Sequence, residues 1–161
     1  MAAKIVDPTS LFAFRLNVAM AMEHDSLAML DELEQAAKSD KVKGMFAHHA
    51  EETRGQIERL ETAFDRLELE VVAAESPTTK GLAEDGRTLV SVTSDDVRDV
   101  AVLGAALGTE HYELAAYLAL VSGAEGMGEE EVKQLLVENL LQERHTGLEL
   151  EVVLRTLLGD S

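Results

Sequence analysis

The chain has 161 residues, a formal net charge of -17, 46% hydrophobic residues and no cysteine. Its length fits a single domain, residues 1–161, with a core over about 11–158 that can form without covalent cross-links. The lack of cysteine excludes disulfides, zinc–thiolate sites and thiol catalysis, and the negative charge argues against binding to nucleic acid or anionic membranes, because both require basic patches.

The first predicted helix begins after Thr9 or Ser10, either of which could cap it, and runs to about Ala37. Apolar residues step by three and four along it, which indicates one buried face. A glutamate occupies a position on that face. The stripe comprises Leu16, Met20, Glu23, Leu27 and Leu30.

The second predicted helix is capped by Ser39 or Asp40 and runs to about Leu69. Its buried stripe is apolar at both ends and polar in the middle. Glu52 follows His49 by three residues and borders the same face. The stripe comprises Val42, Phe46, His49, Thr53, Gln56, Leu60, Ala63 and Leu67.

Residues 70–94 form the least regular part of the chain, interrupted by one proline and two glycines. The alternation in "TLVSV" would suit a strand, but a lone strand has no partner here. The segment is therefore predicted to be a crossover that contains a short helix from about Thr79 to Leu89.

Ser94 is predicted to cap a third helix, which carries "GTEHYELAAY" at 108–117. A glycine-rich turn, "SGAEGMGEEE" at 122–131, separates it from a fourth helix over about 129–158. Both helices again carry a glutamate on an apolar stripe. One stripe is Leu103, Leu107, Glu110, Leu114, Tyr117 and Val121, and the other is Val132, Leu136, Asn139, Glu143, Gly147, Leu150, Leu154 and Leu157.

A single glutamate on an apolar stripe has an ordinary explanation, such as a wrong helical register or a position at the edge of the stripe. Four of them, one near the middle of each long helix, favour convergence in a shared core. Like charges can gather there only if they are protonated or share a cation. Inward glutamates on two helix pairs joined by a crossover describe the carboxylate di-metal bundle, which suits iron or manganese. The candidate ligands are Glu23, Glu52, Glu110 and Glu143.

A family resemblance lies in five segments: "AMEHDSLAMLDEL" at 21–33, "HAEETRGQIERLE" at 49–61, "KGLAEDG" at 80–86, "EHYELAAY" at 110–117 and "ENLLQER" at 138–144. With these segments the chain resembles the YciE/YciF stress proteins, a branch of the ferritin-like superfamily, over roughly residues 11–158. The resemblance implies an all-α fold, namely a ferritin-like four-helix bundle with a long crossover that contains a short fifth helix. It also implies a homodimer. It implies no established reaction, so enzyme activity stays open.

The sequence departs from the superfamily pattern, because the Glu-x-x-His signature is missing from both helices that should bear it. Glu52 is followed three residues later by Gly55, and Glu143 by Thr146, whereas His49 precedes Glu52 in an inverted order. His49 is either a ligand or a hydrogen-bond partner of one, and Glu113 can share the site of Glu110. The candidate set therefore adds Glu113 and His49 as ligands and Gln56 and Tyr117 as second-layer hydrogen-bond partners. The remaining histidines are expected on the surface or at an interface: His24, His48, His111 and His145.

Two hypotheses follow. In the first, the chain is a stress-response protein that holds two iron or manganese ions in its core and handles peroxide or oxygen. In the second, it is a metal-free dimeric bundle with a structural or interaction role, in which the carboxylates form a hydrogen-bonded remnant with His49, Gln56 and Tyr117. Iron storage in a cage is a third alternative, which nothing in the sequence specifies.

The surface predictions concern self-association and location. Leu11, Phe12 and Phe14 fall outside one narrow core stripe and could form an exposed apolar patch in a homodimer. No apolar run approaches the roughly 20 residues that a membrane span needs, and the N-terminus lacks the apolar core of a secretory signal. We therefore expect a cytoplasmic protein without a membrane or nucleic-acid partner.

Overall fold

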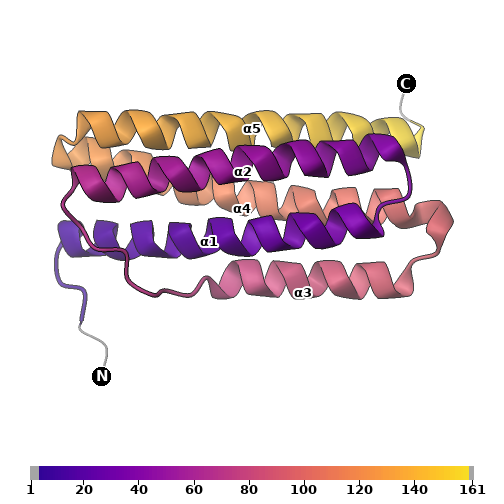
Figure 1. Cartoon of the computed structure of the whole chain (residues 1–161), viewed down its shortest axis with the longest axis horizontal. Helices are drawn as coiled ribbons and strands as arrows, with labels where there is room; N and C mark the ends of the chain where they lie inside the picture. The colour runs from indigo at the N-terminus through magenta and orange to yellow at the C-terminus, as the bar shows by residue number, and fades with distance from the viewer. Residues whose placement is uncertain (1–3, 160–161) are drawn as a thin grey trace.

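The computed structural model describes residues 4–159, which are helical throughout apart from short connections and contain no strand. The fold is therefore all-α, as predicted. Four long helices lie side by side, and a shorter helix packs along the pair formed by the first and third of them (Figure 1). The long helices are α1 (Pro8–Ala36), α2 (Asp40–Arg66), α4 (Arg98–Met127) and α5 (Glu130–Leu158), and the shorter one is α3 (Pro77–Val92).

The first two helices begin with side-chain caps, and both caps lie at or near the predicted positions. Asp7 caps α1 and accepts a hydrogen bond from the backbone nitrogen of Ser10 at 2.8 Å, while Pro8 occupies the first turn, where its missing N–H costs nothing. The prediction of Thr9 or Ser10 as the cap was wrong by two or three residues. Ser39 caps α2 through the backbone nitrogen of Val42.

The crossover is more helical than predicted, since α3 extends beyond 79–89 at both ends and includes "TLVSV". A single 3-10 turn, η1 (Asp95–Val97), then leads into α4. Asp99 in the first turn of α4 accepts hydrogen bonds from the backbone nitrogens of Lys38 at 2.7 Å and Ser39 at 3.0 Å. This carboxylate ties the start of α4 to the connection between α1 and α2.

The predicted turn at 122–131 is mostly helix. The helix α4 continues to Met127, and the turn is confined to Gly128 and Glu129. The φ of Gly128, 75°, lies in the left-handed region that favours glycine. Gly123 lies inside α4, where its missing Cβ allows α1 to come close. A Cβ at this position would lie 2.6 Å from Cδ2 of Phe12.

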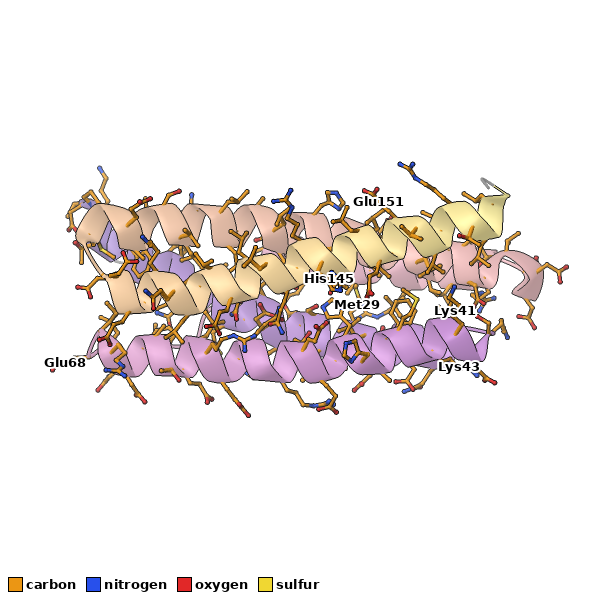
Figure 2. All side chains as sticks on the ribbon, turned by 90° about the horizontal axis from the view of Figure 1, so that it is seen from above. Met29, Lys41, Lys43, Glu68, His145 and Glu151 are labelled. Atoms are coloured by element: carbon orange, nitrogen blue, oxygen red, sulfur yellow. The ribbon has the colours of Figure 1, made fainter. Side chains whose placement is uncertain are left out.

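The interior has two apolar clusters separated along the helices by a polar layer. The first is built around Leu16, Leu60, Phe64 and Leu136, and the second around Leu30, Phe46, Leu103 and Leu150. The sequence positions between these clusters carry the buried polar residues. Side chains project into the space between the ribbons along the whole length (Figure 2). Packed apolar side chains therefore enclose the polar layer at both ends.

Within the described residues, no helix combines the length and the apolar character that crossing a membrane would require.

Candidate metal centre

The centre of the polar layer consists of one histidine and three glutamates from three helices. Each of the four offers one potential ligand atom, and these atoms all lie within 4.8 Å of one another. All four residues are buried, with at most 3% of their surface exposed. Glu110 and Glu113 reach the same place because residues three apart share a helix face. The four are His49 of α2, Glu110 and Glu113 of α4, and Glu143 of α5.

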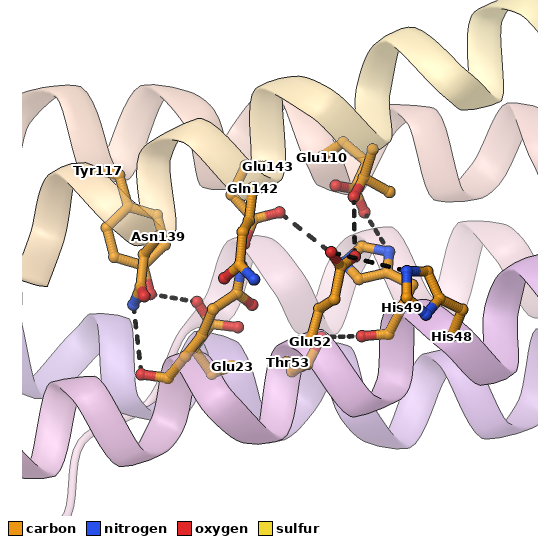
Figure 3. Close-up of polar contacts among 12 residues, drawn as sticks. Glu23, His48, His49, Glu52, Thr53, Glu110, Tyr117, Asn139, Gln142 and Glu143 are labelled. Carbon is orange, nitrogen blue, oxygen red and sulfur yellow. Dashed lines mark hydrogen bonds and ion pairs between the residues drawn. The ribbon is translucent and has the colours of Figure 1, made fainter.

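The imidazole of His49 lies between two carboxylates that come from different helices. Its Nδ1 is 3.2 Å from Oε1 of Glu110, and its Nε2 is 3.8 Å from Oε2 of Glu143 (Figure 3). The side-chain amide of Gln56, about two helical turns further along α2, donates to Oε1 of Glu143. Gln56 is thus a hydrogen-bond partner of a candidate ligand.

A second polar group, around Glu23 of α1, adjoins this centre toward the first apolar cluster. The Tyr117 hydroxyl donates to Oε1 of Glu23, and both residues are fully buried. The Asn139 amide donates to the Tyr117 hydroxyl at 2.9 Å, and Arg59 donates from Nε to Oδ1 of Asn139. Glu23 and Tyr117 lie at one end of the close-up and His49 and Glu110 at the other (Figure 3). A chain of hydrogen bonds therefore joins a partly exposed guanidinium to a buried carboxylate.

Glu52 stands at the edge of the layer and does not belong to the group of four. Its side chain is 19% exposed and lies 3.8 Å from Nε2 of the exposed His48. On the inner side, its Oε2 accepts a hydrogen bond from the Thr146 hydroxyl at 3.4 Å. The structure thus places Glu113 among the buried carboxylates and Glu52 between them and the solvent.

The remaining histidines point outward. His24 is exposed, His111 is bonded to the carbonyl oxygen of Leu107 in its own helix, and His145 is paired with Glu149 at 3.5 Å. His48 is exposed as well, although it contacts Glu52. None of the four reaches the buried group.

Burial dominates the protonation equilibria of the layer. It raises the pKa of Glu110, Glu113 and Glu143 well above the usual range, and the neighbouring carboxylates raise them further. Burial also raises the pKa of Glu23 to about 7, although the hydrogen bond from Tyr117 opposes this shift. The pKa of His49 falls to about 4, mainly through burial. At neutral pH the isolated protein therefore keeps a neutral imidazole beside partly protonated carboxyls.

The polar layer contains a concentration of unsatisfied lone pairs. Among the described residues, eight buried side-chain oxygen or nitrogen atoms have no hydrogen-bond partner, and seven of them belong to this layer. Native structures contain few such atoms, because each one costs free energy when it loses its water. Carboxylate oxygens and one imidazole nitrogen are the donor set that iron and manganese accept. The residues present therefore fit a bound cation. The seven atoms are Glu23 Oε2, His49 Nε2, Gln56 Oε1, Glu110 Oε2, Glu113 Oε1, Glu113 Oε2 and Glu143 Oε2.

Sequence reasoning did not single out Asn139, Arg59 or Thr146 as part of the layer. Asn139 was recognisable as a polar residue on the α5 stripe, one turn before Glu143. Arg59 and Thr146 gave no comparable signal, because their partners are Asn139, 80 positions away, and Glu52, 94 positions away.

Known proteins resemble the chain over most of its length. The chain is 32% identical to Protein YciF of Escherichia coli (strain K12) over 142 residues, which cover 87% of this chain and 86% of that protein. The crystal structure of the E. coli stress protein YciF superposes with a TM-score of 0.93 at 28% identity, covering 98% of this chain and 100% of that one. YcfI of Rhodopseudomonas palustris gives a TM-score of 0.89 at 26% identity, covering 94% of this chain and 97% of that one.

The family described as "Domain of unknown function (DUF892)" matches residues 7–160. Together with the relationship to YciF, this match establishes what the sequence motifs indicated. The chain is a member of the DUF892 family of YciF-like proteins.

Proposed function

We propose that this protein is a ferritin-like stress-response protein whose four-helix bundle binds iron or manganese in the polar layer. The observation that carries the proposal is the group of seven buried, unpartnered atoms on six side chains that converge from four helices. A cation would give these lone pairs a partner and would remove the repulsion among the carboxylates. The kinship with the E. coli stress protein YciF supports the assignment to stress physiology.

The side chains suggest a division of labour in such a site. His49, Glu110, Glu113 and Glu143 lie close enough together to bind one ion. Glu23 adds a carboxylate to this group on the side of Tyr117, and Glu52 adds one on the side of His48. Two ions could therefore share the central carboxylates. Bound iron or manganese would supply one-electron chemistry toward peroxide or oxygen. The protein's own part is to orient the ligands and to exclude water with the two apolar clusters.

The hydrogen bonds of the layer orient the candidate ligands. Gln56 fixes one oxygen of Glu143, and Tyr117 fixes one oxygen of Glu23. In each case the second oxygen remains unpartnered and available to a cation. Such outer partners commonly tune both the orientation and the basicity of metal ligands.

The alternative is a metal-free bundle with a structural or interaction role. The raised pKa values of Glu110, Glu113 and Glu143 favour it, because protonated carboxyls can remain buried without a cation. The related YcfI carries a provisional description as a structural protein.

We further propose that the protein forms a homodimer through α1 and α4. Leu11 and Phe14 are 40% and 52% exposed, and with Tyr112 and Ala116 they line a depression of about 250 Å³. Phe12, which the sequence grouped with them, is instead 5% exposed and belongs to the core beside Gly123.

Elemental analysis tests the metal proposal. Protein purified without added metal should contain iron or manganese at a fixed ratio to the chain, and Glu113→Gln should lower that ratio. Glu51→Gln is the matched control, because Glu51 is exposed on α2 and pairs only with Arg54 among the described residues. Wild-type protein that remains metal-free after incubation with either ion and desalting would favour the structural alternative.

A further inference from the structure

A cavity of about 240 Å³ leads from the surface between α2 and α5 toward the candidate metal centre. Its outer rim includes the exposed residues Gly44, His48 and Glu149, and its inner wall includes the buried residues His49 and Thr146. This volume has room for several water molecules. The cavity therefore connects solvent with the layer through space that side chains leave open.

Potential cation ligands follow one another along this cavity. Glu149 lies at the rim, and Glu52 lies deeper, between the exposed His48 and the buried Thr146. The interactions of Glu52 with these two residues are long, 3.8 Å and 3.4 Å, so its carboxylate can exchange them for a cation at little cost.

One residue at the inner end of the cavity, His49, carries an unsatisfied nitrogen. Nε2 of His49 is buried and has no hydrogen-bond partner, while Nδ1 of the same ring faces Glu110 at 3.2 Å. His49 thus lines the cavity and also lies against the carboxylates of Glu110 and Glu143. A neutral imidazole with a free nitrogen is a ligand for divalent transition metals.

A second cavity, of about 170 Å³, reaches Glu110 and Glu143 from the other side of α5. It is a poorer route for a cation, because its exposed rim carries Arg144 and no carboxylate, whereas its two glutamates are buried. The rim between α2 and α5 also has a cation, Lys41, but Glu52 and Glu149 outnumber it. Carboxylates that line a cleft attract cations and raise their association rate.

We infer that the cavity between α2 and α5 is the entrance through which a divalent cation reaches the buried cluster, and that Glu52 receives the cation and passes it to His49. The inference rests on the proposed metal binding but concerns a separate property, the path and rate of loading. It assigns to Glu52 a role in transfer that fits its half-buried position between the solvent and the buried ligands.

The test measures how fast metal-free protein takes up Co²⁺, whose visible absorption changes when protein ligands replace water. Gly44→Leu places a side chain in the mouth, where an added Cβ meets no atom within 4 Å. Gly104→Leu in α4 is the matched control, because this glycine is also exposed, has equally open surroundings and does not line the cavity. Glu149→Lys reverses a charge at the rim, and its control is Glu151→Lys on the same helix but outside the cavity.

Glu149→Lys should slow uptake by about ten-fold, the low end of the effect of electrostatic focusing on association rates. Gly44→Leu should also slow it, because its side chain obstructs the mouth. Their final Co²⁺ content should equal that of the wild type, and both controls should load at the wild-type rate. Glu149→Lys keeps the test decisive if Gly44→Leu does not fold. Raising the salt concentration should slow the wild type more than Glu52→Gln, because salt screens the attraction.

Two other outcomes separate the two proposals. If wild-type protein binds Co²⁺ at equilibrium and the rim variants load at its rate, the entrance lies elsewhere and metal binding stands. If wild-type protein takes up no Co²⁺, Mn²⁺ or Fe²⁺ at equilibrium, both the metal centre and its entrance are wrong.

Discussion

The Nδ1 atom of His49 lies 3.2 Å from Oε1 of Glu110, and at most 4% of either side chain is exposed. Burial lowers the pKa of the histidine to about 4 and raises the pKa of the glutamate. Both groups are therefore driven toward their neutral forms in the metal-free protein. The carboxyls of the layer can remain buried only if they are protonated or bind a cation.

The pH dependence of metal-free stability follows from these shifts. The carboxyls of Glu23, Glu110, Glu113 and Glu143 have a higher pKa in the folded than in the unfolded state, so their contribution is fully present below the unfolded pKa and is lost as pH rises through the folded pKa. For Glu23 this window runs from about 4.5 to about 7. His49 acts in the opposite sense, because its lowered pKa costs stability as pH falls from about 6.5 through about 4.

Above pH ~6.5 the histidine no longer changes the free energy of unfolding with pH. Only the contribution of the carboxyls still changes, and it falls as pH rises. The free energy of unfolding in chelator should therefore decrease between pH 6.5 and 8.5, as urea titrations at several pH values can measure. In saturating Mn²⁺ the trend should weaken or reverse, because a cation binds the ionised carboxylates. A metal-free stability that is flat or rises over this range would contradict the protonation scheme.

Tyr117 should stabilise the fold through its hydroxyl. Tyr117→Phe removes the donor to Glu23 and the acceptor for Asn139 while it keeps the ring in the core. Since both partners are buried, we expect a loss of about 1–3 kcal/mol in the free energy of unfolding at pH 6. Tyr112→Phe is the control, because Tyr112 is half-buried and its hydroxyl makes no hydrogen bond within residues 4–159. Equal stability of the two variants would mean that the chain of hydrogen bonds from Arg59 to Glu23 contributes nothing.

The close contact between α1 and α4 predicts an unusual effect of a glycine substitution. An alanine in a helix interior is normally better than glycine by about 1 kcal/mol. Gly123→Ala should instead destabilise the protein by about 1–3 kcal/mol, because the new Cβ meets Phe12. Gly104→Ala, with no atom within 4 Å of its Cβ, should stabilise it. Thermal unfolding of both variants distinguishes them, and a gain in stability for Gly123→Ala would show that the helices do not pack in this way.

The homodimer prediction concerns the exposed side chains of Leu11 and Phe14. Light scattering should give a mass of twice 17.5 kDa for the wild type, and Phe14→Glu should return the monomer mass because it places a charge in the apolar interface. Val152→Glu is the control, since Val152 is an exposed apolar residue of α5. A wild-type mass near 17.5 kDa at micromolar concentration would refute the dimer.

The sequence was most informative where periodicity alone decides the outcome. Glu23, Glu110 and Glu143 each lie on a long apolar stripe, and the structure buries all three. A wrong register would have moved them to the surface, but a stripe of five or more positions allows only one register. The all-α fold was predictable for the same reason.

Positions at the edge of a stripe could not be assigned from the sequence. Glu52 and Glu113 both border a buried face, yet Glu113 is fully buried and Glu52 is not. The rotation of each helix against its neighbours decides between them, and that rotation depends on packing between distant segments. The same limit applies to Gly123. The glycine-rich segment predicted a turn, whereas this glycine serves a close contact with Phe12, which is distant in sequence.

The most direct test of a cation-binding layer compares thermal unfolding of wild type, Glu110→Gln and the control Glu51→Gln at neutral pH, in chelator and in Mn²⁺ or Fe²⁺. In chelator, Glu110→Gln should be more stable than wild type, by an amount within the range of about 1–4 kcal/mol seen when buried ionic groups are replaced by packed apolar ones. The metal should raise the melting temperature of wild type and of Glu51→Gln, and should raise that of Glu110→Gln much less. If Glu110→Gln melts below wild type in chelator and neither metal shifts either protein, Glu110 is a structural residue and the layer binds no cation.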